Sequence, residues 1–331
     1  MLRKKYISYN KTIRHMRVEW EGVFPAVTTK FTEDDRLDIE AFLANIGAQL
    51  AAGVSGIILG GTLGEASTLS EEEKAVLVRE TVSFVEGRVP VILNIAEQTT
   101  AGAVEAAASA GRNGASGLML LPPMRYKADE RETVAYFKAV AASTHLPIMI
   151  YNNPIDYRIL VTLDMFSELV ECDNIQAVKE STREVGNITR MHNRFGERFR
   201  ILSGVDTIAL ESLVLGADGW VAGLVCAFPR ETVAIYELVK AGRLKEAVAL
   251  NRWFYPLLEL DVHPKLVQNI KLAEVHTGLG TEQVRLPRLP LEGEEREQVL
   301  HIIQQALSTR PNLDDMLDGQ QVTQKRRVAA E

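Results

Sequence analysis

Eight short apolar runs, each followed by a longer amphipathic stretch, constrain this chain more than any other feature. They cover residues 22–29, 56–60, 89–96, 117–122, 146–152, 175–180, 200–205 and 219–225. Their length and β-branched content are typical of strands buried on both faces. Strictly alternating strands and helices form a parallel sheet, and eight such units fit a closed barrel. We therefore predict an α/β fold, a (β/α)8 TIM barrel, with a doubly wound open sheet as the alternative.

The stretches between these runs carry the start and stop signals of helices. In residues 69–87, Ser70 is placed to cap a helix, Glu73 completes a capping box and Gly87 marks the end. After the eighth run, residues 231–309 contain more helix-forming sequence than one crossover needs. The prediction is therefore a barrel and a C-terminal helical extension with an additional segment at each end. These parts cover residues 1–20 (an extension outside the barrel), 21–230 (the barrel), 231–309 (the helical domain) and 310–331 (a flexible tail).

Composition and charge exclude several classes of partner. The 331 residues are 46% hydrophobic and carry a net charge of −7, and the basic clusters lie only at the two ends. An acidic chain gains no counterion-release affinity, so we expect no nucleic acid. No apolar run is long enough to span a membrane, and no apolar segment follows the basic N-terminus. Cys172 and Cys226 fit neither a metal site nor a disulfide framework, so we expect a cytoplasmic protein.

Polar residues gather where four of the predicted strands end, which is where barrel enzymes place their active sites. One group is the glycine-rich turn of residues 60–65, "GGTLGE". Its backbone N–H groups and the start of the next helix suit a carboxylate or a phosphate, although a tight structural turn is the more common explanation of such a glycine-rich loop taken alone. The other three groups are "YNNP" (151–154), "KES" (179–181) and "SGVD" (203–206).

Tyr151 and Lys179 end neighbouring strands in this scheme, so their side chains are expected to meet above the barrel. An amine beside apolar walls loses proton affinity, and a neutral lysine can attack a ketone to form a Schiff base. A tyrosine phenol can relay the protons that imine chemistry needs. The competing interpretation is that both are amphipathic side chains at the rim of a core.

Metal chemistry has weaker support in the sequence. The six histidines show no metal-ligand spacing. The strand-end carboxylates Glu65, Glu180 and Asp206 could form a magnesium site, although Glu65 and Glu180 are better explained by hydrogen bonds to loop backbone or by local pairing. We therefore expect no metal. A metal-dependent lyase and a non-catalytic barrel that binds a 2-oxo acid remain the alternatives from other classes.

Together, the strand-end motifs resemble one enzyme family from about residue 20 to residue 308. The motifs are "GGTLGE", "YNNP", "AVKES", "LSGVD" and "LGADGWVAG". They are similar to those of the dihydrodipicolinate synthase / N-acetylneuraminate lyase family of class I aldolases. The resemblance implies a (β/α)8 barrel with a C-terminal helical domain, a homotetramer built as a dimer of dimers, and no cofactor beyond a covalent imine on Lys179.

The resemblance also assigns roles to individual residues. It implies that Lys179 forms the Schiff base with pyruvate or another 2-oxo acid, that Tyr151 relays protons, and that Thr62 orients Tyr151. The backbone around Thr62 and Leu63 corresponds to the loop that binds the substrate carboxylate. The substrate-binding positions implied are Gly61, Leu63, Gly64, Gly204, Val221, Arg125 and Asp156.

Three of these positions depart from the synthase pattern. Leu63 replaces a hydroxyl residue, and Arg125 falls where the synthase has a tyrosine reached across the subunit interface, with Tyr126 beside it. Asp156 falls where an arginine reads the carboxylate of the second substrate, with Arg158 two residues on. An anion there disfavours an acidic aldehyde.

The chemistry therefore looks retained and the specificity altered. The main hypothesis is a Schiff-base lyase with a second substrate other than aspartate semialdehyde. It would be a sugar-acid or hydroxy-oxo-acid aldolase, a dehydratase, or a pyrroline-carboxylate deaminase. The synthase's own reaction of pyruvate with aspartate semialdehyde, in lysine biosynthesis, is the alternative.

Overall fold

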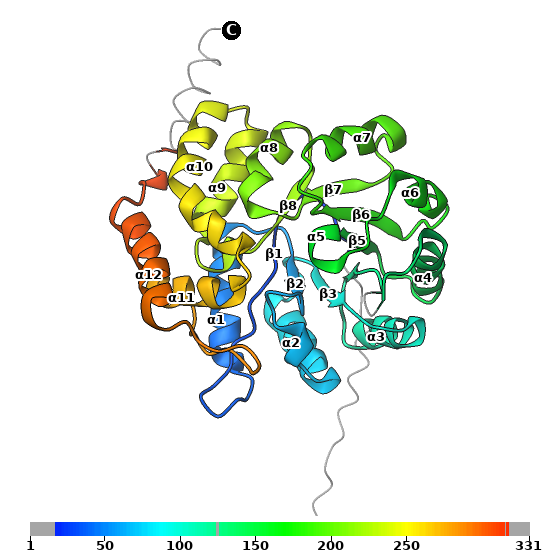
Figure 1. Ribbon diagram of the computed structural model, residues 1–331, viewed down its shortest axis with the longest axis horizontal. Coiled ribbons are helices and arrows are strands. Elements are labelled where there is room, and N and C mark those ends of the chain that lie inside the picture. The colour runs from blue at the N-terminus through cyan, green and yellow to red at the C-terminus, as the bar shows by residue number, and fades with distance from the viewer. Residues whose placement is uncertain (1–16, 124–125, 315, 318–331) are drawn as a thin grey trace, which may run out of the picture.

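Eight parallel strands form the centre of the molecule (Figure 1). They are β1 (Gly22–Pro25), β2 (Ile57–Leu59), β3 (Val91–Ile95), β4 (Gly117–Leu120), β5 (Ile148–Asn152), β6 (Ile175–Glu180), β7 (Arg200–Ser203) and β8 (Gly219–Ala222). The computed structural model describes residues 17–123, 126–314 and 316–317. Each strand lies within one of the eight predicted runs.

The strands close on themselves, which settles the choice between a barrel and an open sheet. The order in the sheet is β1-β8-β7-β6-β5-β4-β3-β2. Its two ends meet through a parallel bridge between Ala26 and Ile58, and the Val27 amide donates a 3.0 Å hydrogen bond to the Ile58 carbonyl. The predicted (β/α)8 TIM barrel is therefore confirmed.

A ring of helices covers the barrel. It consists of α1 (Ile39–Ala52), α2 (Glu71–Val85), α3 (Thr100–Arg112), α4 (Glu130–Ala142), α6 (Leu163–Leu169), α7 (Gly186–Phe195), α8 (Ala209–Val214) and α9 (Pro229–Lys240). The capping box predicted for α2 is present, because the Ser70 hydroxyl accepts from the Glu73 amide and the Glu73 carboxylate accepts from the Ser70 amide. The helix ends as its sequence indicates, with Glu86 and Gly87 both in the left-handed conformation.

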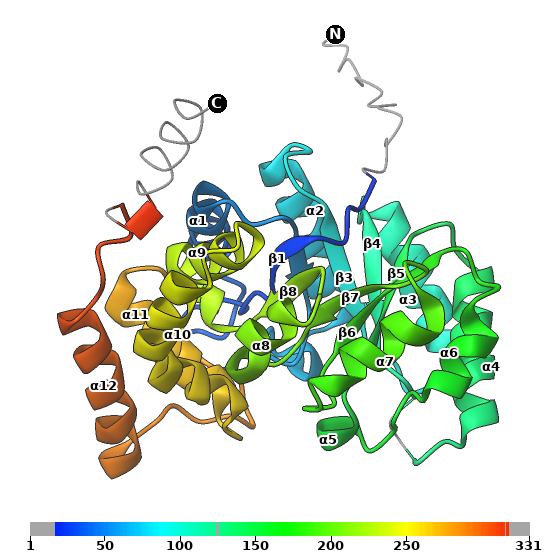
Figure 2. The ribbon, with the colours of Figure 1, turned by 90° about the horizontal axis from the view of Figure 1, so that it is seen from above.

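Three further helices, α10 (Leu244–Leu258), α11 (Leu266–Thr277) and α12 (Gly293–Ser308), extend the fold. Figure 2 shows them on the side of α1 and α9, away from α3, α4 and α6. Helix α9 packs against α1, β1 and β8, so it is the eighth helix of the barrel. The predicted boundary at residue 231 therefore falls inside a barrel helix, and the extension proper begins after α9.

Both predicted end segments pack more closely than expected where the structure describes them. Val18 and Trp20 are buried in the inner core, and the Trp20 indole donates a 3.1 Å hydrogen bond to Gln176. At the other end, Leu313 is buried and Arg310 pairs with the buried carboxylate of Glu231. The expectation that residues 1–20 lie outside the barrel is thus wrong for residues 17–20. Residues 1–16, 315 and 318–331 lie outside the described part of the chain.

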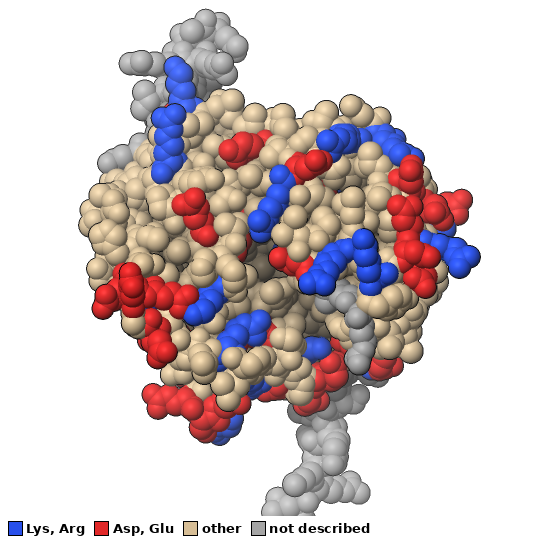
Figure 3. All heavy atoms as spheres, viewed as in Figure 1, with Lys and Arg blue, Asp and Glu red and all other residues tan. Residues whose placement is uncertain are grey.

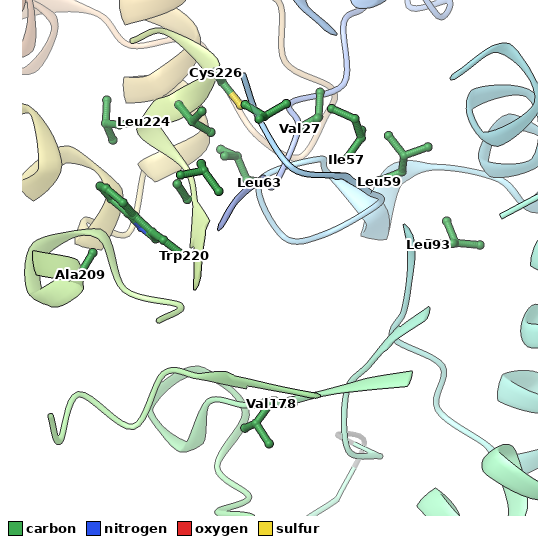
Figure 4. Packing of buried hydrophobic residues seen from close by; sticks show 14 of the residues in the cluster. Val27, Ile57, Leu59, Leu63, Leu93, Val178, Ala209, Trp220, Leu224 and Cys226 are labelled. Atoms are coloured by element: carbon green, nitrogen blue, oxygen red, sulfur yellow. The ribbon is translucent and has the colours of Figure 1, made fainter. Parts of the chain in front are cut away.

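Residues alternate along each strand between two hydrophobic layers. The outer layer packs under the helices and includes Ile57, Leu59, Leu93, Val178 and Trp220 (Figure 4). The inner layer fills the barrel with Phe24, Ile58, Ile92, Met119, Met149, Tyr151, Ala177, Leu202 and Val221. Since alternate residues share a face, Lys179 points inward like Ala177, two positions before it.

Two buried ion pairs join α11 to the barrel. Lys30, just beyond β1, pairs with Glu274 at 2.9 Å, and Lys271 pairs with Glu65, beyond β2, at 2.5 Å. All four side chains are fully buried, and Thr28 donates a further hydrogen bond to Glu274. Burying charges is costly, and good geometry with added hydrogen bonds offsets that cost. These pairs place the helical extension against the ends of β1 and β2.

The described surface is charged and mixed in sign. On the face shown in Figure 3, lysine and arginine side chains are interspersed with acidic ones around a central hollow. Among the described residues, no helix is both long and apolar enough to cross a membrane. Cys172 and Cys226 are free thiols.

The Lys30–Glu274 pair generates a prediction about stability. Glu274→Gln should lower the free energy of unfolding by about 3–5 kcal/mol, because it leaves a buried ammonium without its counter-charge. Urea denaturation followed by circular dichroism measures this. The matched control is Glu105→Gln, which breaks an exposed pair with Arg112 and should have little effect. Equal effects of the two substitutions would contradict the structural role assigned to the buried pair.

Candidate active site

Lys179 and Tyr151 meet at the C-terminal ends of β6 and β5. They are direct partners in the register of the two strands, and the Lys179 Nζ lies 4.0 Å from the centroid of the Tyr151 ring. Each side chain is only 7% exposed. The prediction that the two side chains meet above neighbouring strands is confirmed.

Both side chains line a cavity of about 460 Å³ at the mouth of the barrel. The predicted site residues that line it with them are Gly61, Thr62, Leu63, Asp156, Gly204 and Val221. Gly64 does not line it, and its carbonyl accepts a 2.7 Å hydrogen bond from Thr29 instead. Arg125 lies outside the described residues. Two larger hollows, of about 730 and 1000 Å³, contain neither Lys179 nor Tyr151.

The surroundings of Lys179 favour the neutral amine. Burial is the main cause and lowers the pKa of Lys179 below its ordinary value, against the opposing effect of nearby Asp261, Asp206 and Asp156. A lysine with a lowered pKa is neutral more of the time at physiological pH, and the neutral form is the nucleophile.

The surroundings of Tyr151 favour the neutral phenol. Burial raises the pKa of Tyr151 to about 12, although a 3.1 Å hydrogen bond donated by the Asn153 amide opposes the shift. At neutral pH the side chain therefore carries its proton, as a proton donor to a developing alkoxide must. Asn153 belongs to the "YNNP" motif but was not singled out from the sequence.

A second tyrosine, which sequence reasoning missed, adjoins this pair. Tyr157 ends the short helix α5 (Pro154–Tyr157), and its ring lies edge-on to the Tyr151 ring with centroids 5.4 Å apart. Its hydroxyl forms a 2.5 Å hydrogen bond with the Thr62 hydroxyl. Thr62 was predicted to orient Tyr151, whereas the hydrogen bond that the structure shows for its side chain goes to Tyr157.

Gly204 leaves room for the lysine. A Cβ at this position would lie 2.6 Å from the Lys179 Cγ and 2.7 Å from its Cε. Any larger residue would therefore displace the amine from its place beside Tyr151. This is a packing reason for the glycine in "LSGVD".

The three carboxylates considered for a magnesium site have separate partners. Glu65 pairs with Lys271 and accepts from the Arg285 amide, and Glu180 accepts from the Thr182 amide at 2.8 Å. The predicted hydrogen bonds to loop backbone are confirmed for both, with a local partner, Thr182, for Glu180 and with Arg285 of a distant loop for Glu65. Asp206, which is fully buried, accepts hydrogen bonds from the Trp220 indole and the amides of Gly223 and Leu224. Within the described residues, no group of three or more His, Cys, Asp or Glu side chains could hold a metal ion.

Charged residues of both signs line the outer part of the cavity. Asp156 accepts a 2.7 Å hydrogen bond from the Asn153 amide, which therefore bonds both Asp156 and Tyr151. Arg158 does not line the cavity. Arg183, an exposed residue on the loop after β6, does line the cavity, and its sequence context had given no sign of this.

One carboxylate reaches the cavity from outside the barrel. Asp261 belongs to η4 (Glu259–Val262), the 3-10 turn between α10 and α11, and it lines the cavity together with Lys179. Burial, with Asp206 nearby, raises the pKa of Asp261 well above its ordinary value, and Lys179 opposes the shift. Nothing in the local sequence of a helical extension marks such a residue.

The lowered pKa of Lys179 can be measured directly. Competitive labelling with acetic anhydride over a range of pH, read by peptide mass spectrometry, should give a midpoint for Lys179 below 10.5. Asp261→Asn should lower that midpoint further, because it removes a charge that favours the ammonium. A midpoint at or above 10.5 in the unsubstituted protein would show that burial does not dominate.

The chain has clear relatives among known proteins. The model of the dihydrodipicolinate synthetase family matches residues 19–306. The 4-hydroxy-tetrahydrodipicolinate synthase of Exiguobacterium sibiricum is 32% identical over 288 residues, which are 86% of this chain and 96% of that protein. The structure of the same synthase from Methylacidiphilum fumariolicum has a TM-score of 0.81 at 31% identity, with 87% of this chain and 97% of that chain covered.

A further similar structure contains a bound small molecule. It is YagE, a prophage protein of the dihydrodipicolinic acid synthase family from Escherichia coli K12, in complex with pyruvate. Its TM-score to this chain is 0.81 at 27% identity, and the match covers 86% of this chain and 98% of YagE.

Proposed function

Because the chain belongs to the dihydrodipicolinate synthetase family, a family of class I aldolases and lyases, we propose that it joins pyruvate or a related 2-oxo acid to Lys179 as a Schiff base. The observation that carries this proposal is the buried Lys179 amine, with its lowered pKa, over the Tyr151 ring in a cavity. The structure of YagE in complex with pyruvate supports the choice of substrate.

The proposed chemistry is based on the protonation states of the two side chains. The neutral Lys179 amine attacks the carbonyl carbon, and Tyr151 donates a proton to the oxygen. Tyr151 regains a proton from the amine nitrogen, and the hydroxyl of the carbinolamine then leaves as water with a proton from Tyr151, which gives a protonated imine (iminium) and a phenolate that can accept the next proton. Loss of a proton from the adjacent carbon gives an enamine, which forms a carbon–carbon bond with an aldehyde in one direction. Cleavage of the product uses the same steps in reverse.

The substrate carboxylate is proposed to lie against the turn formed by Gly61, Thr62 and Leu63. All three residues line the cavity, and backbone N–H groups at such a turn suit an anion. Leu63 contributes no side-chain hydrogen bond there. Since the iminium itself withdraws electrons from the reacting carbon, the proposed reaction needs no cofactor and no metal.

Two second substrates are supported by different observations. The curated relatives are named for the 4-hydroxy-tetrahydrodipicolinate synthase reaction, which favours aspartate semialdehyde. Asp156 lines the cavity and occupies the position that the resemblance gives to the residue reading that substrate's carboxylate, which favours a partner without a carboxylate. We propose that the second substrate is not aspartate semialdehyde. The protein would then be a sugar-acid or hydroxy-oxo-acid aldolase, a dehydratase or a pyrroline-carboxylate deaminase. The synthase is the second candidate.

The family resemblance supports two further proposals. A homotetramer is the expected assembly, and sedimentation velocity measures it. A cytoplasmic location agrees with the two free thiols. A non-catalytic 2-oxo-acid-binding barrel, the other class considered, would bind ligand without turnover.

Substitution of the two central residues tests the chemistry. With borohydride and pyruvate, the protein should gain the mass of a reduced pyruvyl adduct on Lys179, and Lys179→Ala should gain none. Tyr151→Phe should still be trapped but should turn over about 100-fold more slowly, as expected for the loss of a general acid–base. Intact-protein mass spectrometry and steady-state kinetics measure the two effects. No adduct with any 2-oxo acid, or normal turnover by Tyr151→Phe, would contradict the assigned roles.

The charge of Asp156 tests the second substrate. Steady-state rates with pyruvate and a panel of aldehydes should favour neutral partners such as glyceraldehyde over aspartate semialdehyde. Asp156→Asn should raise the relative kcat/KM for the semialdehyde about fivefold by removing a repulsive charge. A strong preference of the unsubstituted protein for the semialdehyde would establish the synthase reaction instead.

A further inference from the structure

Asp261 brings the helical extension into the catalytic cavity. A Cβ at Gly223, just after β8, would lie 2.2 Å from the Asp261 Oδ1, so the carboxylate rests directly on the backbone at the end of that strand. The turn that carries it, η4, packs against η2 (Asp206–Ile208), which comes after β7. Asp261 is therefore held close to the end of the barrel, on the side of β7 and β8, facing the same space as Lys179.

Unlike Asp206 and Asp156, the two carboxylates whose charges act on it, Asp261 has side-chain oxygens that are free to accept a hydrogen bond. Asp206 accepts from an indole and two backbone amides, and Asp156 accepts from Asn153. For the Asp261 side chain, the structure shows neither a hydrogen bond nor an ion pair among the described residues. Its residue is half-buried and lines the cavity. A partly desolvated carboxylate without a donor loses hydration and gains nothing in return, so a donor brought by a ligand would be favourable.

The charges around Asp261 define which donors fit. Lys179 and Arg183 act on it as cations, and Asp206 and Asp156 act on it as anions. Lys179 ceases to be a simple ammonium when it forms the imine, and the two carboxylates disfavour a further anion. The space beside Asp261 therefore suits a neutral hydroxyl or a cationic ammonium group.

We propose that Asp261 accepts a hydrogen bond from a hydroxyl or ammonium group of the compound joined to Lys179, and so selects substrates that carry such a donor. The proposal rests on the imine at Lys179, but not on either choice of second substrate. Sugar acids and hydroxy-oxo acids supply the donor as a hydroxyl, and aspartate semialdehyde supplies it as an ammonium. An analogue with a methyl group in its place leaves the carboxylate unsatisfied.

Borohydride trapping with matched 2-oxo acids tests the proposal without a need for turnover. The probes are 4-hydroxy- and 5-hydroxy-2-oxopentanoate, and their methyl analogues are 4-methyl-2-oxopentanoate and 2-oxohexanoate. Adduct masses distinguish each probe from any cleavage product. In the unsubstituted protein, at least one hydroxylated probe should reach half-maximal trapping at a concentration about 10- to 100-fold lower than its analogue. In Asp261→Ala, the hydroxylated probe and its methyl analogue should be trapped at about equal concentrations, and in Asp261→Asn the difference between them should be smaller.

The ratio of trapping between a hydroxylated probe and its methyl analogue separates recognition of the hydroxyl group from the reactivity of the Lys179 amine. Loss of the Asp261 charge also changes the pKa of Lys179, but this affects both members of a pair alike. The matched control is Glu259→Gln, which removes an exposed carboxylate of the same turn and should leave the ratio unchanged. Circular dichroism and thermal unfolding identify any variant that fails to fold, and Asp261→Asn, which preserves volume over Gly223, then serves in place of Asp261→Ala.

Three outcomes would overturn the proposal. Equal trapping of both hydroxyl probes and their analogues by the unsubstituted protein would show that the site does not recognise the hydroxyl group. An unchanged ratio in folded Asp261 variants would show that another residue recognises the hydroxyl group. A uniform weakening of all probes would mean that Asp261 only serves the structure or pairs with Arg183. Absence of any adduct, even with pyruvate, would instead refute the imine at Lys179 and remove the basis of the proposal.

Discussion

The desolvation of one amine is the constraint on which the rest of the site depends. Lys179 is inward-facing on a strand of a closed barrel, so its ammonium form is penalised and its nucleophilic form is favoured. Gly204 leaves the space in which the amine sits, and the Tyr151 ring covers it. Three carboxylates in the surroundings oppose the effect of burial. The pKa of Lys179, and with it the fraction of reactive neutral amine, is therefore set by burial, which lowers it, and by the nearby negative charges, which raise it.

The barrel and the extension contribute differently to this balance. The barrel places Lys179 and Tyr151 side by side through the register of β5 and β6. The extension reaches the same cavity through η4, and two fully buried ion pairs fasten the next helix, α11, to the ends of β1 and β2. The imine-forming pair and Asp261 are thus held by separately anchored parts, so the residue at position 261 can vary while the imine-forming pair stays in place.

Short-range periodicity made the barrel predictable from the sequence. All eight strands lie within the predicted runs, because a buried parallel strand has a distinctive composition. The meeting of Lys179 with Tyr151 could be predicted because neighbouring strands end at the same rim. Sequence reasoning failed where contacts depend on how separate parts pack. The sequence around Trp20 does not indicate that its ring packs in the inner core of the barrel. Asp261 lies in a helical extension and belongs to no recognisable motif. Tyr157 lies just past the "YNNP" motif, and its bond to Thr62 depends on the fold of α5.

The charge of Asp261 has an unfavourable effect on the first step of the proposed reaction. Its charge favours the ammonium form of Lys179 and so opposes the attack that begins the chemistry. Burial of Asp261 raises its own pKa, which weakens that opposition by favouring the neutral acid. In the proposed role, a substrate donor bonds to the Asp261 carboxylate once the imine holds the substrate in the cavity. A group placed this way slows nucleophilic attack slightly, yet it discriminates among bound compounds, which is the trade expected of a residue that selects rather than reacts.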